Sequence, residues 1–200
     1  MKVNDQMSRL RFRSGRGGLR WRHGLLLWLF TGCLAGVTLE DLRRDVKLTP
    51  RSFARYFADF SYKFHEEIQT PEVFLATQNG DCDDYATLAD LILREKGYTT
   101  RLMAVRMPGL THVVCYVAET KCYLDFNNRT YLVRTVSSGG SLQDVARKVA
   151  KSFEANWTSA SEFTYGNGVK RLVTTITKTQ PYMASPVPVT NPPSPVRIDF

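Results

Sequence analysis

One stretch constrains this 200-residue chain more than any other: Asn79-Gly80-Asp81-Cys82-Asp83-Asp84-Tyr85-Ala86, where a turn signal runs into a helix that begins with a cysteine. Gly80 permits a sharp turn, and Asp81 is a residue type that favours the N-cap position. The apolar pattern predicts a helix over residues 82–96 that is apolar on two sides and therefore buried. Free backbone N–H groups and a partial positive charge at the helix N-terminus would stabilise a thiolate at Cys82.

The basic charge of the chain is concentrated at its N-terminus. The formal net charge is +8, but residues 1–24 hold seven of the 27 Lys and Arg side chains and one of the 19 acidic ones. The remaining 20 basic and 18 acidic side chains nearly balance, and they form no basic stripe with interleaved aromatic residues. We therefore expect no nucleic-acid partner.

The uncharged residues 24–37 follow this basic block. A membrane span needs about 20 apolar residues, so this shorter segment suits the hydrophobic region of a secretory signal peptide. Three fates stay open for it: lipidation at Cys33, because Leu29-Phe30-Thr31-Gly32-Cys33 resembles a bacterial lipobox; cleavage at the small residues beginning at Cys33; or retention as an N-terminal anchor. Each predicts export to the cell envelope or periplasm and contact with the membrane through this segment.

Composition divides the chain into four parts. We predict the export or anchor segment at 1–37, a linker or peripheral helix at 38–48, a folded domain at 49–178 and a disordered tail at 179–200. The tail carries six prolines between Pro181 and Pro195, a composition that cannot build a core.

Within the folded domain, helix signals come first and strand signals follow. Thr49-Pro50 and Thr70-Pro71 each combine an N-cap residue with a proline at the first helical position. After Gly97 the apolar period changes from helical to alternating, which predicts an antiparallel meander of strands. The predicted strands run from Thr99 to the Pro108-Gly109 turn and over residues 112–118, 122–126 and 131–136; a helix capped by Ser141 and two closing strands follow.

Cys82 needs a base to act as a nucleophile, and His112 is the histidine best placed for that role. His23 lies in the export segment, and His65 lies in a charged stretch typical of a solvated surface. His112 opens a strand, which can bring its imidazole to the N-terminus of a helix packed beside it. Asp125 lies on the following strand among apolar residues, where a carboxylate is costly unless it is paired. The sequence predicts Cys82 as nucleophile, His112 as base and Asp125 as the group that orients the imidazole.

These motifs resemble the catalytic core of the transglutaminase-like cysteine peptidases. The resemblance rests on residues 80–86 on a helix, Thr111-His112-Val113-Val114 on a strand and Tyr123-Leu124-Asp125 on the next. It implies an α+β fold with a papain-like core, in which the cysteine helix packs on an antiparallel sheet. It also implies acyl transfer from a protein or peptide amide through an acyl-enzyme. Water as acceptor gives a peptidase or amidase and an amine gives a crosslinker; a short exported chain of bacterial type favours hydrolysis.

The surroundings of Cys82 suggest two further roles. Its backbone N–H is the expected first donor to an oxyanion, and Gln78 and Asn79 are the candidates for the second. Asp81, Asp83 and Asp84 are either helix caps, as acidic residues in a first turn commonly are, or a Ca²⁺ site. Similar acidic motifs bind Ca²⁺ in the periplasmic transglutaminase-like proteases that trim bacterial adhesins. The predicted reaction itself requires no cofactor.

The same strands place two more cysteines close together. If His112 lies directly opposite Asp125, then Cys115 faces Cys122. This pair forms a disulfide in an oxidising compartment or stays reduced in the core.

Two functional hypotheses follow. The first is a monomeric, exported or membrane-tethered cysteine hydrolase that acts on a protein or peptide. The second keeps the fold without the reaction, as a catalytically inactive transglutaminase-like binding or scaffolding module. The presence of all three triad residue types favours the enzyme.

Overall fold

The structure is a computed structural model that describes residues 36–131 and 134–179. Cys33, nearly all of the predicted export segment and all but the first residue of the predicted tail lie outside the described residues. In the described part of the chain, no helix has both the length and the apolar character needed to cross a membrane.

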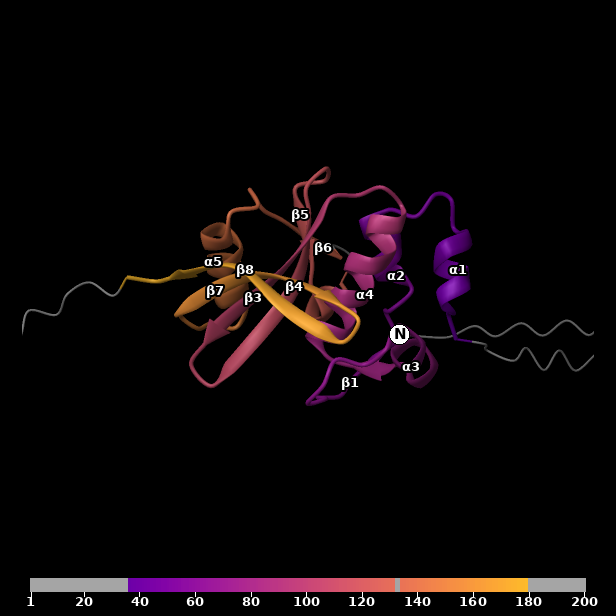
Figure 1. Ribbon diagram of the computed structural model, residues 1–200, viewed down its shortest axis with the longest axis horizontal. Coiled ribbons are helices and arrows are strands. Elements are labelled where there is room, and N and C mark those ends of the chain that lie inside the picture. Colours follow the sequence, from indigo (N-terminus) through magenta and orange to yellow (C-terminus); the bar gives the residue numbers. More distant parts are fainter. Residues whose placement is uncertain (1–35, 132–133, 180–200) are drawn as a thin grey trace, which may run out of the picture. The chain divides into compact units, whose positions relative to one another are not determined.

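The elements appear in the predicted order, helices first and the sheet afterwards (Figure 1). The helices are α1 (Leu39–Arg44), α2 (Pro50–Arg55), α3 (Pro71–Thr77), α4 (Cys82–Glu95), the 3₁₀ helix η1 (Phe126–Asn128) and α5 (Leu142–Ser152). The strands are β1 (Ser61–Tyr62), β2 (Asn79–Gly80), β3 (Thr100–Met107), β4 (Leu110–Val117), β5 (Cys122–Leu124), β6 (Thr135–Ser137), β7 (Ser159–Gly166) and β8 (Val169–Thr177). The α+β fold class is confirmed.

The main sheet has the strand order β6-β5-β4-β3-β7-β8, and all its neighbours are antiparallel. The predicted order of the meander is therefore confirmed for β3 to β6, but its last strand, predicted over residues 131–136, covers only residues 135–137. The closing hairpin of β7 and β8 adds to the free edge of β3, which makes β3 a central strand, as its two apolar faces predict. A parallel pair of two-residue strands, β1 and β2, was not predicted.

The two faces of the sheet are covered by different helices (Figure 1). Helix α4 packs on the face that carries Leu102, Val113 and Cys115. Helix α5 packs on the opposite face, with Met103 and Val114. His112 shares the α5 face because side chains alternate along β4, whereas Cys82 begins the helix on the other face. The reacting groups must therefore meet at the end of the sheet.

Helix α4 is the buried centre of the domain. Its N-cap is Asp81, and Asp81 and Asp84 form a capping box. The aromatic side chains that surround it come from α2, the turn after it, α3 and η1: Phe53, Phe57, Phe74 and Phe126, with Tyr85 of α4 among them. Leu91 is 36% exposed, so the predicted second apolar side of α4 is only partly buried.

The predicted register between the two strands after α4 is wrong. Cys115 pairs with Leu124 and Cys122 pairs with Val117, a shift of two residues from the arrangement that would oppose His112 to Asp125. The reason is that β5 ends at Leu124, and Asp125 caps η1 instead of continuing the strand. Cys115 and Cys122 are both free and buried, so the structure contains no disulfide between them.

Gly80 sits where the chain turns into α4, and a side chain there has no room. A Cβ atom at Gly80 would lie 2.5 Å from Asp84 Oδ2 and 2.7 Å from the ring of Phe74. We expect Gly80→Ala to lower the free energy of unfolding by about 1–3 kcal/mol in urea titrations, because the capping carboxylate and the ring must both shift. The control is Gly139→Ala, whose Cβ would meet only Asp144 Oδ2 at 3.9 Å. Equal stability of the two variants would contradict this packing.

Candidate active site

The three predicted catalytic residues meet at the end of the sheet. His112 Nε2 lies 2.9 Å from Asp125 Oδ1, and the same oxygen accepts a 2.9 Å hydrogen bond from the backbone N–H of Asn127. The side chain of Cys82 also contributes to raising the pKa of the His112 ring, whose remaining nitrogen is Nδ1. The sulfur of Cys82 accepts a 3.4 Å hydrogen bond from the backbone N–H of Val113. His112 and Asp125 follow Cys82 by 30 and 43 positions in the sequence. The helix, the strand and the turn that carry these residues nevertheless bring them together.

The three residues differ in their access to solvent. His112 and Asp125 are 4% and 1% exposed, whereas Cys82 is half-buried. The ring of Phe153, just after α5, covers His112 edge-on with the ring centroids 4.8 Å apart. A substrate can therefore reach the sulfur while the histidine and carboxylate stay shielded from water.

Two opposing effects set the protonation of His112. Burial lowers its pKa, but the hydrogen bonds and charges of Asp125 and Cys82 outweigh it and raise the pKa to about 10. The imidazolium is therefore the favoured form at neutral pH.

Backbone donors hold two of the three acidic residues at the start of α4. Asp81 accepts the N–H groups of Asp83 at 3.2 Å and His65 at 3.1 Å. Asp84 accepts the backbone N–H and the side-chain amide of Gln69, at 2.7 and 2.8 Å, and the N–H of Asp81 at 3.1 Å. These contacts fix the segment before α4 and therefore the position of Cys82.

Asp83 is the acidic residue of this group that lacks such support. Its Oδ1 is buried without a hydrogen-bond partner. Burial, together with the charges of Asp81 and Asp84, raises its pKa to about 8. Asp83 therefore carries a proton at neutral pH, in the first turn beside Cys82.

The acidic group fits helix capping better than calcium binding. One oxygen from each of Asp81, Asp83 and Asp84 lies within 4.8 Å of the others, close enough to share an ion. A Ca²⁺ ion takes about six to eight oxygen ligands, and here it would compete with N–H groups already bound to Asp81 and Asp84. Calcium binding stays a prediction, and no step of the chemistry below uses it.

Gln78 and Asn79 do not point into the site. Gln78 ends α3 in the left-handed conformation, with φ 52°, and its side chain lies beside Gly36 in a separate groove. The side-chain amide of Asn79 donates to the carbonyl of Thr77 at 2.9 Å. Neither side chain lines the cleft around Cys82. The backbone N–H of Cys82 belongs to the first helical turn, whose N–H groups have no partner within the helix.

A cleft of about 840 Å³ opens over Cys82. One side of the cleft comes from the first turn of α4 and from the segment before it, which contributes Tyr62, His65 and Glu66. The other side comes from the ends of β3 and β4, and its side chains include Arg106, Phe153 and Lys170. His65 was predicted to lie on a solvated surface, but it is half-buried and lines this cleft. Phe153 and Lys170 were missed as site residues, because no local pattern in the sequence marks them.

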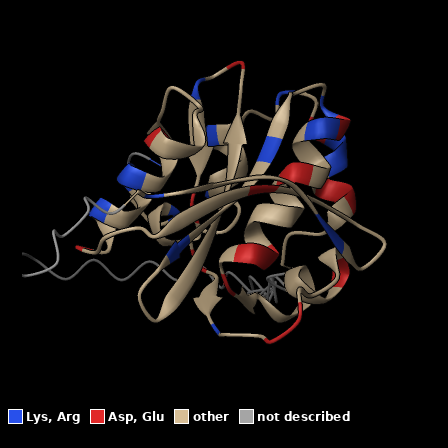
Figure 2. Cartoon of the chain, turned by 60° about the vertical axis from the view of Figure 1, so that its left-hand side comes forward, with Lys and Arg blue, Asp and Glu red and all other residues tan. Residues whose placement is uncertain are grey.

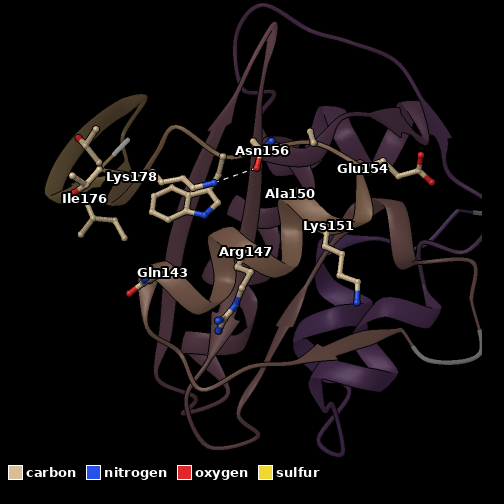
Figure 3. Close-up of a pocket in the computed structure, with 12 residues that line it drawn as sticks. Gln143, Arg147, Ala150, Lys151, Glu154, Asn156, Ile176 and Lys178 are labelled. Atoms are coloured by element: carbon tan, nitrogen blue, oxygen red, sulfur yellow. Dashed lines mark hydrogen bonds between the residues drawn. The ribbon is translucent and has the colours of Figure 1, made fainter. Parts of the chain in front are cut away.

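A second pocket lies beside α5 (Figure 3). It has a volume of about 1080 Å³ and is lined by residues of α5, the segment after it and the end of β8. Lys178 donates a 3.2 Å hydrogen bond to the Oδ1 of Asn156 across it. Cys82, His112 and Asp125 do not line this pocket, so we place the chemistry in the cleft.

Comparison with known families supports the same assignment of the fold. Residues 44–132 match the model of the transglutaminase-like superfamily. This match is consistent with a transglutaminase-like fold. The matched segment runs from the end of α1 past η1 and includes Cys82, His112 and Asp125. No curated protein matches the chain.

The raised pKa of Asp83 predicts how the stability of the folded domain depends on pH. Its pKa rises from 3.8 to about 8 on folding, so the folded state binds the extra proton between these values and stability falls as the pH rises through that range. We expect Asp83→Asn, which cannot ionise, to melt about 2–4 °C above the wild type at pH 8 and close to it at pH 4. Thermal melts followed by circular dichroism measure this.

The exposed Asp59→Asn is the matched control and should not move the melting temperature at either pH. The same melts in calcium and in chelator test the alternative role. A wild type that melts higher in calcium, together with an Asp83→Asn variant that loses this gain, would show that Asp83 is a ligand and would contradict its neutral state.

Proposed function

We propose that Cys82, His112 and Asp125 catalyse thiol-dependent acyl transfer on a protein or peptide amide, with hydrolysis as the outcome. One observation carries the proposal: the buried His112–Asp125 hydrogen bond lies at the same cleft as Cys82, whose sulfur accepts the backbone N–H of Val113, the residue after His112. This is the relation of nucleophile, base and orienting group that acyl transfer needs.

In the first half of the reaction, the Cys82 thiolate attacks the amide carbonyl carbon and forms the C–S bond. The carbonyl oxygen takes the negative charge and accepts a hydrogen bond from the backbone N–H of Cys82, where the helix dipole adds to its stabilisation. His112 gives its proton to the leaving nitrogen as the C–N bond breaks. An acyl-enzyme and a free amine result.

In the second half, His112 is neutral and acts as the general base. It takes a proton from water while the water oxygen attacks the thioester, and the C–S bond breaks to return the thiolate and the imidazolium. Asp125 keeps the ring oriented in both halves and stabilises its positive charge. The half exposure of Cys82 supports water as the acceptor, because solvent reaches the acyl group.

The setting of the reaction is proposed from the sequence. The basic block and the uncharged residues 24–37 support export to the cell envelope or periplasm, with the domain tethered as a lipoprotein through Cys33 or by a retained anchor. The domain would act there as a monomer on a protein or peptide. Nothing in the proposed chemistry requires a cofactor.

Selective alkylation of Cys82 tests the proposed function. We expect iodoacetamide at pH 7 to modify Cys82 in the full chain, and His112→Ala to slow that modification by at least about tenfold because the thiolate loses its counter-ion. Asp125→Asn should slow it less, since the imidazole remains. Mass spectrometry of the Cys82 peptide gives the rates.

Cys122→Ala is the control, because this buried cysteine lies outside the cleft and its removal should leave the rate at Cys82 unchanged. A rate at Cys82 that does not depend on His112 would mean that the pair is not activated. The chain would then be an inactive binding or scaffolding module with a transglutaminase-like fold.

A further inference from the structure

Two cations of the sheet line the cleft around Cys82: Arg106 of β3 and Lys170 of β8. Both residues are exposed, and among the residues that the structure describes neither has a carboxylate within ion-pair distance. Arg101, on the same strand as Arg106, differs in this respect because it forms an ion pair with Glu162. Neither cation of the cleft is therefore neutralised by an ion pair within the described part of the chain.

The backbone fixes Arg106 close to the proposed base. Arg106 pairs with Thr111 of β4, the residue directly before His112. Its carbonyl accepts the backbone N–H of Thr158 at 2.8 Å and the Thr158 hydroxyl at 3.2 Å. The backbone of Arg106 is thus held beside His112 by contacts with β4 and with Thr158.

Lys170 reaches the cleft because the β7–β8 hairpin extends toward α4 (Figure 1). The hairpin tip lines a common groove with Thr87, Asp90 and Leu91 of α4. The Nζ of Lys170 lies 4.1 Å from the ring centroid of Phe163, which supports the extended side chain. Its charge acts on the carboxyl group of Asp83, in the first turn of α4.

The acidic residues of the cleft form no ion pair with these cations and come from other segments of the chain. They are Glu66, Asp81 and Asp83, and they come from the N-terminal end of α4 and the segment before it, whereas both cations come from the sheet (Figure 2). Asp81 already accepts two backbone N–H groups. Asp83 lies in the first turn of α4, with its Oδ1 buried. The two cations therefore make the sheet side of the cleft positively charged, and the acidic residues lie on the α4 side.

We propose that Arg106 and Lys170 select acyl substrates that carry an anionic group, such as an Asp or Glu side chain, close to the amide that Cys82 attacks. The inference rests on the proposed function and names the substrate class of that site. A guanidinium and an ammonium group on one wall of a cleft can bind a carboxylate while the sulfur reaches the adjacent carbonyl.

Two alkylating reagents of nearly equal size test the proposal. Iodoacetate and iodoacetamide form the same C–S bond with Cys82 and release iodide, but only iodoacetate is an anion. The measured quantity is the ratio of their rates at Cys82 in the full chain, by mass spectrometry of the Cys82 peptide. The positive charge of His112 favours iodoacetate in every variant and therefore cancels when variants are compared.

We expect Arg106→Gln and Lys170→Gln each to lower the iodoacetate to iodoacetamide ratio by about two- to fivefold, as expected for one charge near the sulfur. The difference should shrink at about 1 M salt, where exposed charges are screened. The matched control is Arg171→Gln, which removes an exposed charge next to Lys170 from a side chain that does not line the cleft.

A ratio that stays at the wild-type value in both Arg106→Gln and Lys170→Gln would overturn the proposal, as would an equal fall in Arg171→Gln. Both results leave the proposed function standing, because neither concerns the dependence on His112. Loss of the His112 dependence of alkylation would instead refute the proposed function, and this inference with it.

Discussion

The structure depends on one buried contact, the hydrogen bond between His112 and Asp125. Both side chains are removed from water, which costs free energy unless each finds a partner. Asp125 gains a second donor from Asn127, and Phe153 covers the ring of His112. With Nε2 held by Asp125, the ring can turn only Nδ1 toward Cys82. The orientation of the base is therefore set by the fold before any substrate binds.

The position of Cys82 follows from how α4 begins. Three acidic residues in the first turn would oppose a thiolate if all were free and charged. Two of them, Asp81 and Asp84, are bound by N–H groups of the preceding segment, and Asp83 holds its proton. The acids thus fix the start of the helix, and the helix dipole and the positive charge of His112 oppose their negative charge there.

Local sequence patterns predicted much of this arrangement. The N-cap, the buried helix and the change to an alternating period each depend on neighbouring residues, and the matched superfamily agrees with the fold they imply. The predicted β4–β5 register was wrong because the register depends on where β5 ends. Asp125 caps η1, and this cap ends β5 at Leu124. Tertiary packing decides that the side chains of Gln78 and Asn79 point away from the cleft. It also brings Phe153 and Lys170 to the cleft. The periodicity of a single strand or helix does not encode such packing.

The protonation of the His112 ring tests the central claim most directly, because it reports the contacts with both Cys82 and Asp125. Nitrogen-15 NMR of histidine-labelled full chain, recorded against pH and assigned with His112→Ala, measures it. The account predicts both ring nitrogens of His112 protonated at pH 8, with a titration midpoint near 10. A neutral ring at pH 8 and a midpoint near the ordinary value of 6.5 would contradict it.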